Sequence, residues 1–153
     1  MKKILITGST GQLGNSLAKV FKSRYDLVST SRTKPNKNTN YYLDITNSLL
    51  VKDMVSAISP DIIINLAALT NVDLCESNTD LAHAINFQGV KNLVNVFKGP
   101  IIHLSTDYVF DGKLGRYKES DITNPINVYG VTKFKAEKIL LEKSKESLVI
   151  RTN

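Results

Sequence analysis

The sequence contains a single cysteine, Cys75, among its 153 residues. This excludes an internal disulfide and fits a protein of the reducing cytoplasm. No histidine stands close to Cys75 in the sequence, so we expect an inert thiol rather than a nucleophile. The two histidines, His83 and His103, are likewise expected to have structural roles.

Long apolar runs and basic blocks are also missing. The first residues, MKKILITG, have only a short apolar run before Gly8, which predicts a first strand rather than a signal peptide. No run approaches the roughly 20 apolar residues that a membrane span needs, so no membrane partner is expected. The formal charge of +6 is spread along the chain. That distribution argues against nucleic-acid binding and is compatible with an anionic ligand such as a nucleotide.

What the sequence does contain is a regular alternation of strand and helix patterns. The order predicts βαβ units in a parallel sheet, and strands that are apolar throughout require helices on both faces. We therefore expect an α/β fold with a doubly wound parallel sheet of the Rossmann type, formed by residues 1–153 as one domain. The expected strands are 2–7, 26–31, 41–45, the start of 61–69, 100–106 and 147–152. The expected helices are 11–24, 47–58, 79–97 and 127–145, with loops at 32–40 and 107–126.

A glycine-rich loop, GSTGQLG, follows the first strand and opens the first helix. Gly8 permits the sharp turn, Gly11 lets the backbone approach a pyrophosphate, and Gly14 allows close packing of helix on sheet. Phosphates would meet free N–H groups at the start of the helix, so this context predicts dinucleotide binding. The residues between the glycines, Thr10, Gln12 and Leu13, belong to the expected cofactor site.

The end of the second strand decides between the two nicotinamide dinucleotides. An acidic residue there would bind the ribose hydroxyls of NAD(H), but the sequence reads Ser31-Arg32-Thr33-Lys34. Arg32, helped by Lys34 or by Ser31, can bind a 2′-phosphate. We therefore favour NADP(H) and keep NAD(H) as the alternative, in which Arg32 is an ordinary loop charge.

Other strand ends point to the same crevice, because ligands of such sheets bind beyond the carboxyl ends of the strands. Asp44 can accept a hydrogen bond from an adenine amine, and Ile45 follows it. After the fourth strand, small side chains let a cofactor lie against the backbone. The expected contacts there are Leu66, Ala67 and Ala68.

The stretch NVYGVTKFKAEK places Tyr129 and Lys133 four residues apart on one face of a predicted helix. At ~100° per residue, Ala136 and Leu140 share this stripe and indicate that it faces the core. A buried lysine needs a partner or a task, unless its amine snorkels to the surface. A nearby ammonium lowers the pKa of a phenol, so the pair predicts an acid–base group.

The preceding strand supplies a third member. Ser105 and Thr106 end that strand, where a hydroxyl can hold a substrate carbonyl for hydride transfer. Asn86, in the helix before it, is expected to support Lys133.

Together these motifs resemble the extended short-chain dehydrogenase/reductase superfamily, in which a GxxGxxG loop, an ST pair and a YxxxK helix recur in this order. The resemblance implies that Thr106 polarises the carbonyl and Tyr129 is the general acid. It implies that Lys133 lowers the pKa of the tyrosine and binds the nicotinamide ribose. Ser105 is expected beside the cofactor and is the alternative to Thr106 as the hydroxyl that polarises the carbonyl.

The segments TGSTGQLG, NLAALTNVDLCES, STDYVFDG and NVYGVTKFKAEK look like the dTDP-4-dehydrorhamnose reductase group. This implies NADPH-dependent reduction of the 4-keto group of a nucleotide-linked 6-deoxysugar, for polysaccharide biosynthesis. Related dehydratases have an Asp-Glu pair after the threonine, whereas Tyr108 follows Asp107 here. Some bacterial members bind a metal at a dimer contact through a glutamate where this chain has Ser16, so no metal is expected and a homodimer stays open. The implied substrate contacts are Thr70, Val72, Asp73, Thr106, Asp107, Tyr108 and Tyr129.

Two alternatives remain open on the same scaffold. One is an epimerase with bound NAD⁺. The other is a non-catalytic NADP-binding regulatory subunit similar to the methionine adenosyltransferase β subunit. The chain stops directly after a predicted strand, so we expect a fragment that lacks the C-terminal region for the sugar nucleotide.

Overall fold

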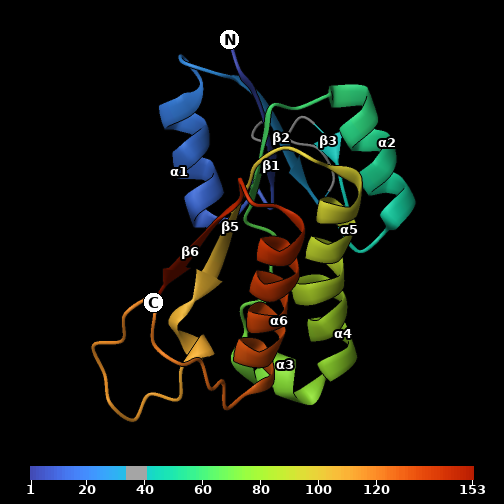
Figure 1. Cartoon of the computed structure of the whole chain (residues 1–153). Coiled ribbons are helices and arrows are strands. Elements are labelled where there is room, and N and C mark those ends of the chain that lie inside the picture. Colours follow the sequence, from blue (N-terminus) through green and yellow to red (C-terminus); the bar gives the residue numbers. More distant parts are fainter. Residues whose placement is uncertain (34–40) are drawn as a thin grey trace.

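The computed structural model describes residues 1–33 and 41–153, and it contains one six-stranded parallel sheet. The strand order is β3-β2-β1-β4-β5-β6, so the chain moves outward from β1 in one direction and then in the other. This confirms the predicted doubly wound fold (Figure 1). The strands are β1 (Lys3–Thr7), β2 (Asp26–Ser31), β3 (Tyr41–Tyr42), β4 (Ile62–Asn65), β5 (Ile101–Thr106) and β6 (Leu148–Thr152).

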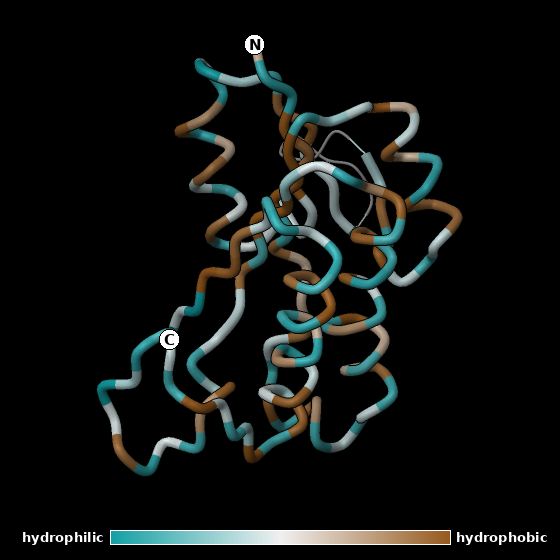
Figure 2. Tube along the Cα trace, viewed as in Figure 1, coloured by the Kyte–Doolittle hydropathy of each residue, from teal (hydrophilic) through white to brown (hydrophobic). Residues whose placement is uncertain are grey.

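Helices cover both faces of the sheet. Helix α1 (Gln12–Phe21) packs on one face, where Leu17 and Phe21 meet Ile4, Ile6 and Ile64. The larger core lies on the other face, beneath α2 (Ser48–Ile58), α5 (Gly89–Val96) and α6 (Val128–Lys143). Figure 2 shows the corresponding pattern, with brown hydrophobic residues along the central strands and alternation of brown and teal along the helices. Within the described ranges, no helix is both long and apolar enough to cross a membrane.

Three elements differ from the sequence prediction. Strand β3 has only two residues rather than the run 41–45, because Asp44 forms a turn by accepting hydrogen bonds from the N–H and hydroxyl of Thr46. The predicted helix 79–97 is divided into α4 (Thr79–His83), a π-helical turn η1 (Ala84–Gln88) and α5.

The third difference is a short helix that the sequence pattern did not reveal, α3 (Val72–Ser77). Its six residues are too few to show a clear apolar period. It begins at Asn71, whose side-chain oxygen accepts a hydrogen bond from the N–H of Leu74. It ends at Asn78, which in turn caps α4.

Candidate functional site

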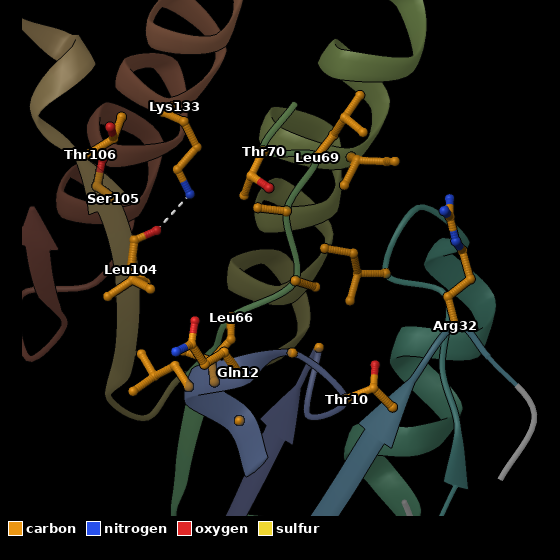
Figure 3. A pocket seen from close by; sticks show the side chains of 18 of the residues that line it. Thr10, Gln12, Arg32, Leu66, Leu69, Thr70, Leu104, Ser105, Thr106 and Lys133 are labelled. Carbon is orange, nitrogen blue, oxygen red and sulfur yellow. Dashed lines mark hydrogen bonds between the residues drawn. The ribbon is translucent and has the colours of Figure 1, made fainter. Parts of the chain in front are cut away.

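A cleft of about 860 Å³ lies at the carboxyl ends of the central strands. In Figure 3, Thr106 and Lys133 lie on one wall, Thr10 and Gln12 lie at the base, and Arg32 lies across from them. The topology produces this crevice because the crossovers from β1 and from β4 leave the sheet in opposite directions. The predicted site residues that line it are Gly8, Thr10, Gly11, Gln12, Leu13, Gly14, Ser31, Arg32, Asp44, Ile45, Leu66, Ala67, Ala68, Thr70, Val72, Ser105, Thr106, Tyr108, Tyr129 and Lys133.

The glycine loop has the geometry that its spacing predicts. Gly8 has φ of +67°, and a Cβ there would lie 2.6 Å from the nitrogen of Ala67. At Gly14 a Cβ would lie 2.6 Å from the Cα of Ser9, so only glycine lets α1 approach the loop this closely. At Gly11 the nearest atom to such a Cβ is the Gly8 oxygen at 3.5 Å, which leaves this position open to the cleft.

Helix α1 begins directly after Gly11, and no side chain of the described residues caps it. Its first N–H groups therefore lie at the cleft without a capping oxygen, which is the arrangement that binds an anion. The loop is held against β2 by the N–H and the hydroxyl of Ser9, both of which donate to the Thr30 carbonyl. The residues fit a pyrophosphate at this point.

The rim near β2 and β3 holds the residues expected around the adenosine. The hydroxyl of Ser31 lies 2.8 Å from that of Thr33, and Arg32 is exposed at the edge of the cleft. Asp44 uses one carboxylate oxygen for the turn with Thr46. Lys34, expected as a second phosphate ligand, lies outside the described residues.

Lys133 is buried, with 2% of its surface exposed, as the helical phase predicts. Its Nζ donates a hydrogen bond to the carbonyl of Leu104 at 2.6 Å and lies 3.3 Å from Nε2 of His103. Burial lowers the pKa of the lysine from 10.5 to about 8, and the carboxylate of Glu137 opposes this effect. The amine is thus brought close to the range in which it exchanges protons at neutral pH.

The Tyr129 phenol does not have the lowered pKa that the sequence analysis expects, and the effect of Lys133 on it stays a prediction. Burial raises the pKa of the Tyr129 phenol, and a hydrogen bond with Thr106 only partly offsets that rise. The Lys133 amine lies against β5, where it donates a hydrogen bond to the Leu104 carbonyl (Figure 3). The four-residue spacing sets a common helix face but does not set the direction of a flexible side chain.

The Thr106 hydroxyl forms the hydrogen bond with Tyr129, while its role toward a carbonyl stays a prediction. Thr106 Oγ1 also accepts from the N–H of Tyr108, whose ring packs edge-on against Tyr129 at 5.6 Å. The hydroxyl of Ser105 donates instead to Glu137 Oε1 at 2.5 Å. Gly130 lets α6 lie close to the backbone of Tyr108, because a Cβ at Gly130 would collide with the Tyr108 carbonyl oxygen.

The side chain of Asn86 is used on the cleft wall, and the expected support of Lys133 by Asn86 stays a prediction. Asn86 does not line the cleft, and its side chain bonds to Leu69 and Thr132 rather than to Lys133. Its oxygen accepts from the Leu69 N–H at 2.7 Å, and its nitrogen donates to the Leu69 carbonyl at 3.0 Å. The π-helical turn η1 places it there, so Asn86 fixes the cleft wall after β4.

Two further predicted substrate contacts, Asp73 and Asp107, also lie outside the lining of this cleft. Asp107 lines a neighbouring cleft of about 840 Å³, together with Phe110, Tyr117 and Arg151. Asp73 is exposed in the first turn of α3.

Sequence reasoning missed two buried groups beside the site, His103 and Glu137. His103 is fully buried and touches both Lys133 and Asn65. Glu137 is one turn beyond Lys133 and pairs with Arg151 at 2.7 Å. A polar residue inside an apolar strand was the available signal for His103, while Glu137 resembles an ordinary helix charge.

Comparison with known proteins gives a consistent result. The family described as "RmlD substrate binding domain" matches residues 1–153. A dTDP-4-dehydrorhamnose reductase from Aggregatibacter actinomycetemcomitans is 41% identical, covering all of this chain and 51% of the relative. The methionine adenosyltransferase 2 subunit beta of Xenopus tropicalis is 34% identical, covering 98% of this chain and 46% of that protein.

Among solved structures, a dTDP-4-dehydrorhamnose reductase from Bacillus anthracis in complex with NADP is similar, with a TM-score of 0.86 and 34% identity. The match covers 99% of this chain and 53% of that one. The chain thus spans about half the length of the relatives it matches.

Proposed function

Because the chain belongs to the RmlD substrate binding domain family, we propose that it carries the cofactor-binding and proton-donating part of an NADP(H)-dependent reductase. The reaction is reduction of the 4-keto group of a nucleotide-linked 6-deoxysugar, as in dTDP-4-dehydrorhamnose reductases. One observation carries this proposal. Thr106, Tyr129 and Lys133 line the same cleft as the glycine loop, so a nucleotide bound at the loop extends toward the three side chains.

The bound cofactor supplies a hydride to the carbonyl carbon. The pyrophosphate is held by the N–H groups at the start of α1, where Gly11 leaves room. Arg32 pairs with a 2′-phosphate, which favours NADP(H) over NAD(H). Ser31, Asp44 and Ile45 line the part of the cleft that would hold the adenosine, and the residues that follow β4 line the part that would hold the middle of the cofactor.

The chain's own residues handle the carbonyl oxygen. The Thr106 hydroxyl donates a hydrogen bond to that oxygen, and the Tyr129 hydroxyl gives it the proton that completes the alcohol. Lys133 binds the nicotinamide ribose and restores the tyrosine proton. Burial raises the pKa of the Tyr129 phenol, so the group is protonated at neutral pH, as a proton donor must be.

The sugar and its nucleotide require a further region, because the chain spans about half of its relatives. We assign to this chain the contacts nearest the reacting carbon. These are Thr70, Val72 and Tyr108, which line the cleft. We propose Asp73 and Asp107, which lie outside its lining, as contacts to more distant parts of the substrate. We also propose a cytoplasmic protein and a homodimer.

The test is NADPH consumption with dTDP-4-dehydrorhamnose, measured on the full-length protein that includes the region for the sugar nucleotide. We expect Tyr129→Phe to abolish it and Lys133→Met to reduce it at least about a hundredfold, within the range of general acid–base effects. Tyr25→Phe, on the α1 face of the sheet, is the matched control and should behave as the unchanged protein. Full activity in Tyr129→Phe would exclude the proposed mechanism.

A second candidate is a cofactor-binding regulatory subunit, favoured by the 34% identity to a methionine adenosyltransferase subunit. It predicts NADP(H) binding and a stable protein partner, with no turnover of any keto sugar. An epimerase would instead retain tightly bound cofactor and show no net NADPH oxidation. Cofactor titration combined with the turnover assay separates the three.

A further inference from the structure

A row of three buried polar side chains crosses the sheet beneath α6. Thr7, Asn65 and His103 are register partners on β1, β4 and β5, and none is more than 1% exposed. Side chains two residues apart on a strand share a face. The residues two positions earlier on these strands belong to the core beneath α5 and α6, so the polar row faces the same helices; they are Leu5, Ile63 and Ile101.

The distances give the row a direction. Thr7 Oγ1 lies 2.5 Å from Asn65 Oδ1, which suits an O–H···O bond and is too short for an N–H donor. The hydroxyl therefore donates, and the amide nitrogen of Asn65 faces Nδ1 of His103 at 2.9 Å. An amide nitrogen only donates, so Nδ1 accepts. A neutral imidazole that accepts at Nδ1 carries its proton on Nε2, the atom 3.3 Å from Lys133 Nζ.

His103 remains neutral in this position. Burial holds the pKa of the imidazole well below its usual range, and the charge of Lys133 lowers it further. The Nε2–H thus points at an amine that already donates to the carbonyl of Leu104 at 2.6 Å. An ammonium has no lone pair, so it would face the His103 Nε2–H as a second donor, which is unfavourable. A neutral Lys133 amine has a lone pair and can accept a hydrogen bond from the Nε2–H.

We propose that Thr7, Asn65 and His103 are positioning residues, joined in a one-way chain of hydrogen bonds that presents the His103 Nε2–H to Lys133 and favours its neutral amine. None of the three lines the cleft, so they act through the lysine. The task given to the lysine rests on the proposed function, whereas the chain of bonds does not.

Several other charged and titratable groups lie in this part of the site. Glu137, on the same helix as Lys133, favours the ammonium by its negative charge, and Glu137 itself forms an ion pair with Arg151. The remaining groups face Tyr129 rather than the amine: Cys75 on α3, with Asp107 and Tyr108 on η2 (Asp107–Val109). His103 and Glu137 therefore oppose one another across Lys133.

This balance suits a lysine that restores the proton of Tyr129. An N–H bond of the ammonium breaks, a bridging water or hydroxyl carries the proton to the phenolate so that the O–H bond of the phenol forms, and the His103 N–H stabilises the amine that remains. A proton from water then returns the amine to its charged form. A lysine that only supplied positive charge would have no use for a donor pointed at its nitrogen.

The experiment compares Thr7→Val with Thr7→Ser by NMR in the absence of cofactor. The His103 tautomer is read from its ring ¹⁵N shifts, and the Lys133 titration from its ¹³Cε signal, assigned by its loss in Lys133→Met. We expect the Nε2–H tautomer in the unchanged protein and in Thr7→Ser. In Thr7→Val the Asn65 amide is free to turn its oxygen to His103, so Nδ1 should be protonated. The proton affinity of Lys133 should then rise about tenfold, one pKa unit.

An Nδ1–H tautomer in the unchanged protein overturns the inference without any variant. The same holds if Thr7→Val alters thermal stability alone and leaves the tautomer and the lysine titration unchanged. The NMR experiment contains no cofactor, so its result does not depend on the proposed function. If the spectra are as predicted but the protein fails to bind NADPH, the proposed function is refuted and the chain of hydrogen bonds is still supported.

Discussion

At the scale of single residues, the site contains buried titratable side chains whose burial lowers the stability of the fold. Lys133 is 2% exposed, and in residues 1–33 and 41–153 the direct partners of its amine are a carbonyl and a neutral imidazole. Tyr129 is buried as well, and its phenol is held away from ionisation. Such groups are retained where chemistry needs them, which is why they stand out among the aliphatic residues of the core.

Replacing Lys133 by methionine should stabilise the fold. The pKa of the lysine is lowered from 10.5 to about 8, and each unit corresponds to about 1.4 kcal/mol against the folded state. Loss of the bond to Leu104 removes about 1 kcal/mol of this gain. We expect the free energy of unfolding in urea at pH 7 to increase by about 1–3 kcal/mol in Lys133→Met.

The pH dependence of the stability difference between Lys133→Met and the unchanged protein tests whether burial of the lysine charge causes it. Between pH 8 and 10.5 the unfolded chain keeps the lysine proton that the folded protein has released. Rising pH therefore favours the folded unchanged protein in this window, and the advantage of Lys133→Met should shrink. An advantage that is constant from pH 7 to 10.5 would show that charge burial is not its source.

At the scale of elements, two glycines of the loop between β1 and α1 have different tasks: Gly14 allows close packing of α1 on the loop, and Gly11 leaves room for the cofactor. The alternation of apolar runs and the glycine spacing predicted this loop, the parallel sheet and the inward face of α6. The direction of Lys133 and the contacts of Asn86 were not predictable. They depend on which carbonyl or amide comes within reach once the strands are packed, and a sequence pattern does not specify this. The π-helical turn η1 is invisible in the sequence for the same reason.

Two alanine substitutions in the loop should have opposite consequences. Gly11 has φ of −69°, which alanine tolerates, and its Cβ would meet no atom closer than 3.5 Å. Gly11→Ala should therefore fold normally and lose at least about tenfold in NADPH affinity, about 1.4 kcal/mol. In Gly14→Ala the Cβ would press on the Ser9 backbone, so unfolding should become easier by about 1–3 kcal/mol.

Thermal denaturation and NADPH titration of both variants separate the two effects. If Gly11→Ala binds NADPH as tightly as the unchanged protein, the pyrophosphate does not approach the loop here. If Gly14→Ala is as stable as the unchanged protein, the close contact of α1 with the loop does not limit this position.

At the scale of the whole molecule, one sheet edge brings together segments that are distant in sequence. The glycine loop, the end of β2, the wall after β4 and the α6 pair meet at a single cleft because parallel strands end at the same edge (Figure 1). Asn86 ties the wall to α6 through Leu69 and Thr132, and Glu137 ties α6 to β6 through Arg151. The cleft is thus fixed by contacts between elements as well as by the sheet.

The most direct test of the central claim is a crystal structure of the protein with NADP⁺. We expect the pyrophosphate at the first N–H groups of α1, the 2′-phosphate beside Arg32, and the nicotinamide ribose within hydrogen-bond distance of Lys133 Nζ. A nicotinamide ring that lies away from Thr106 and Tyr129, or a cofactor bound outside this cleft, would contradict the account.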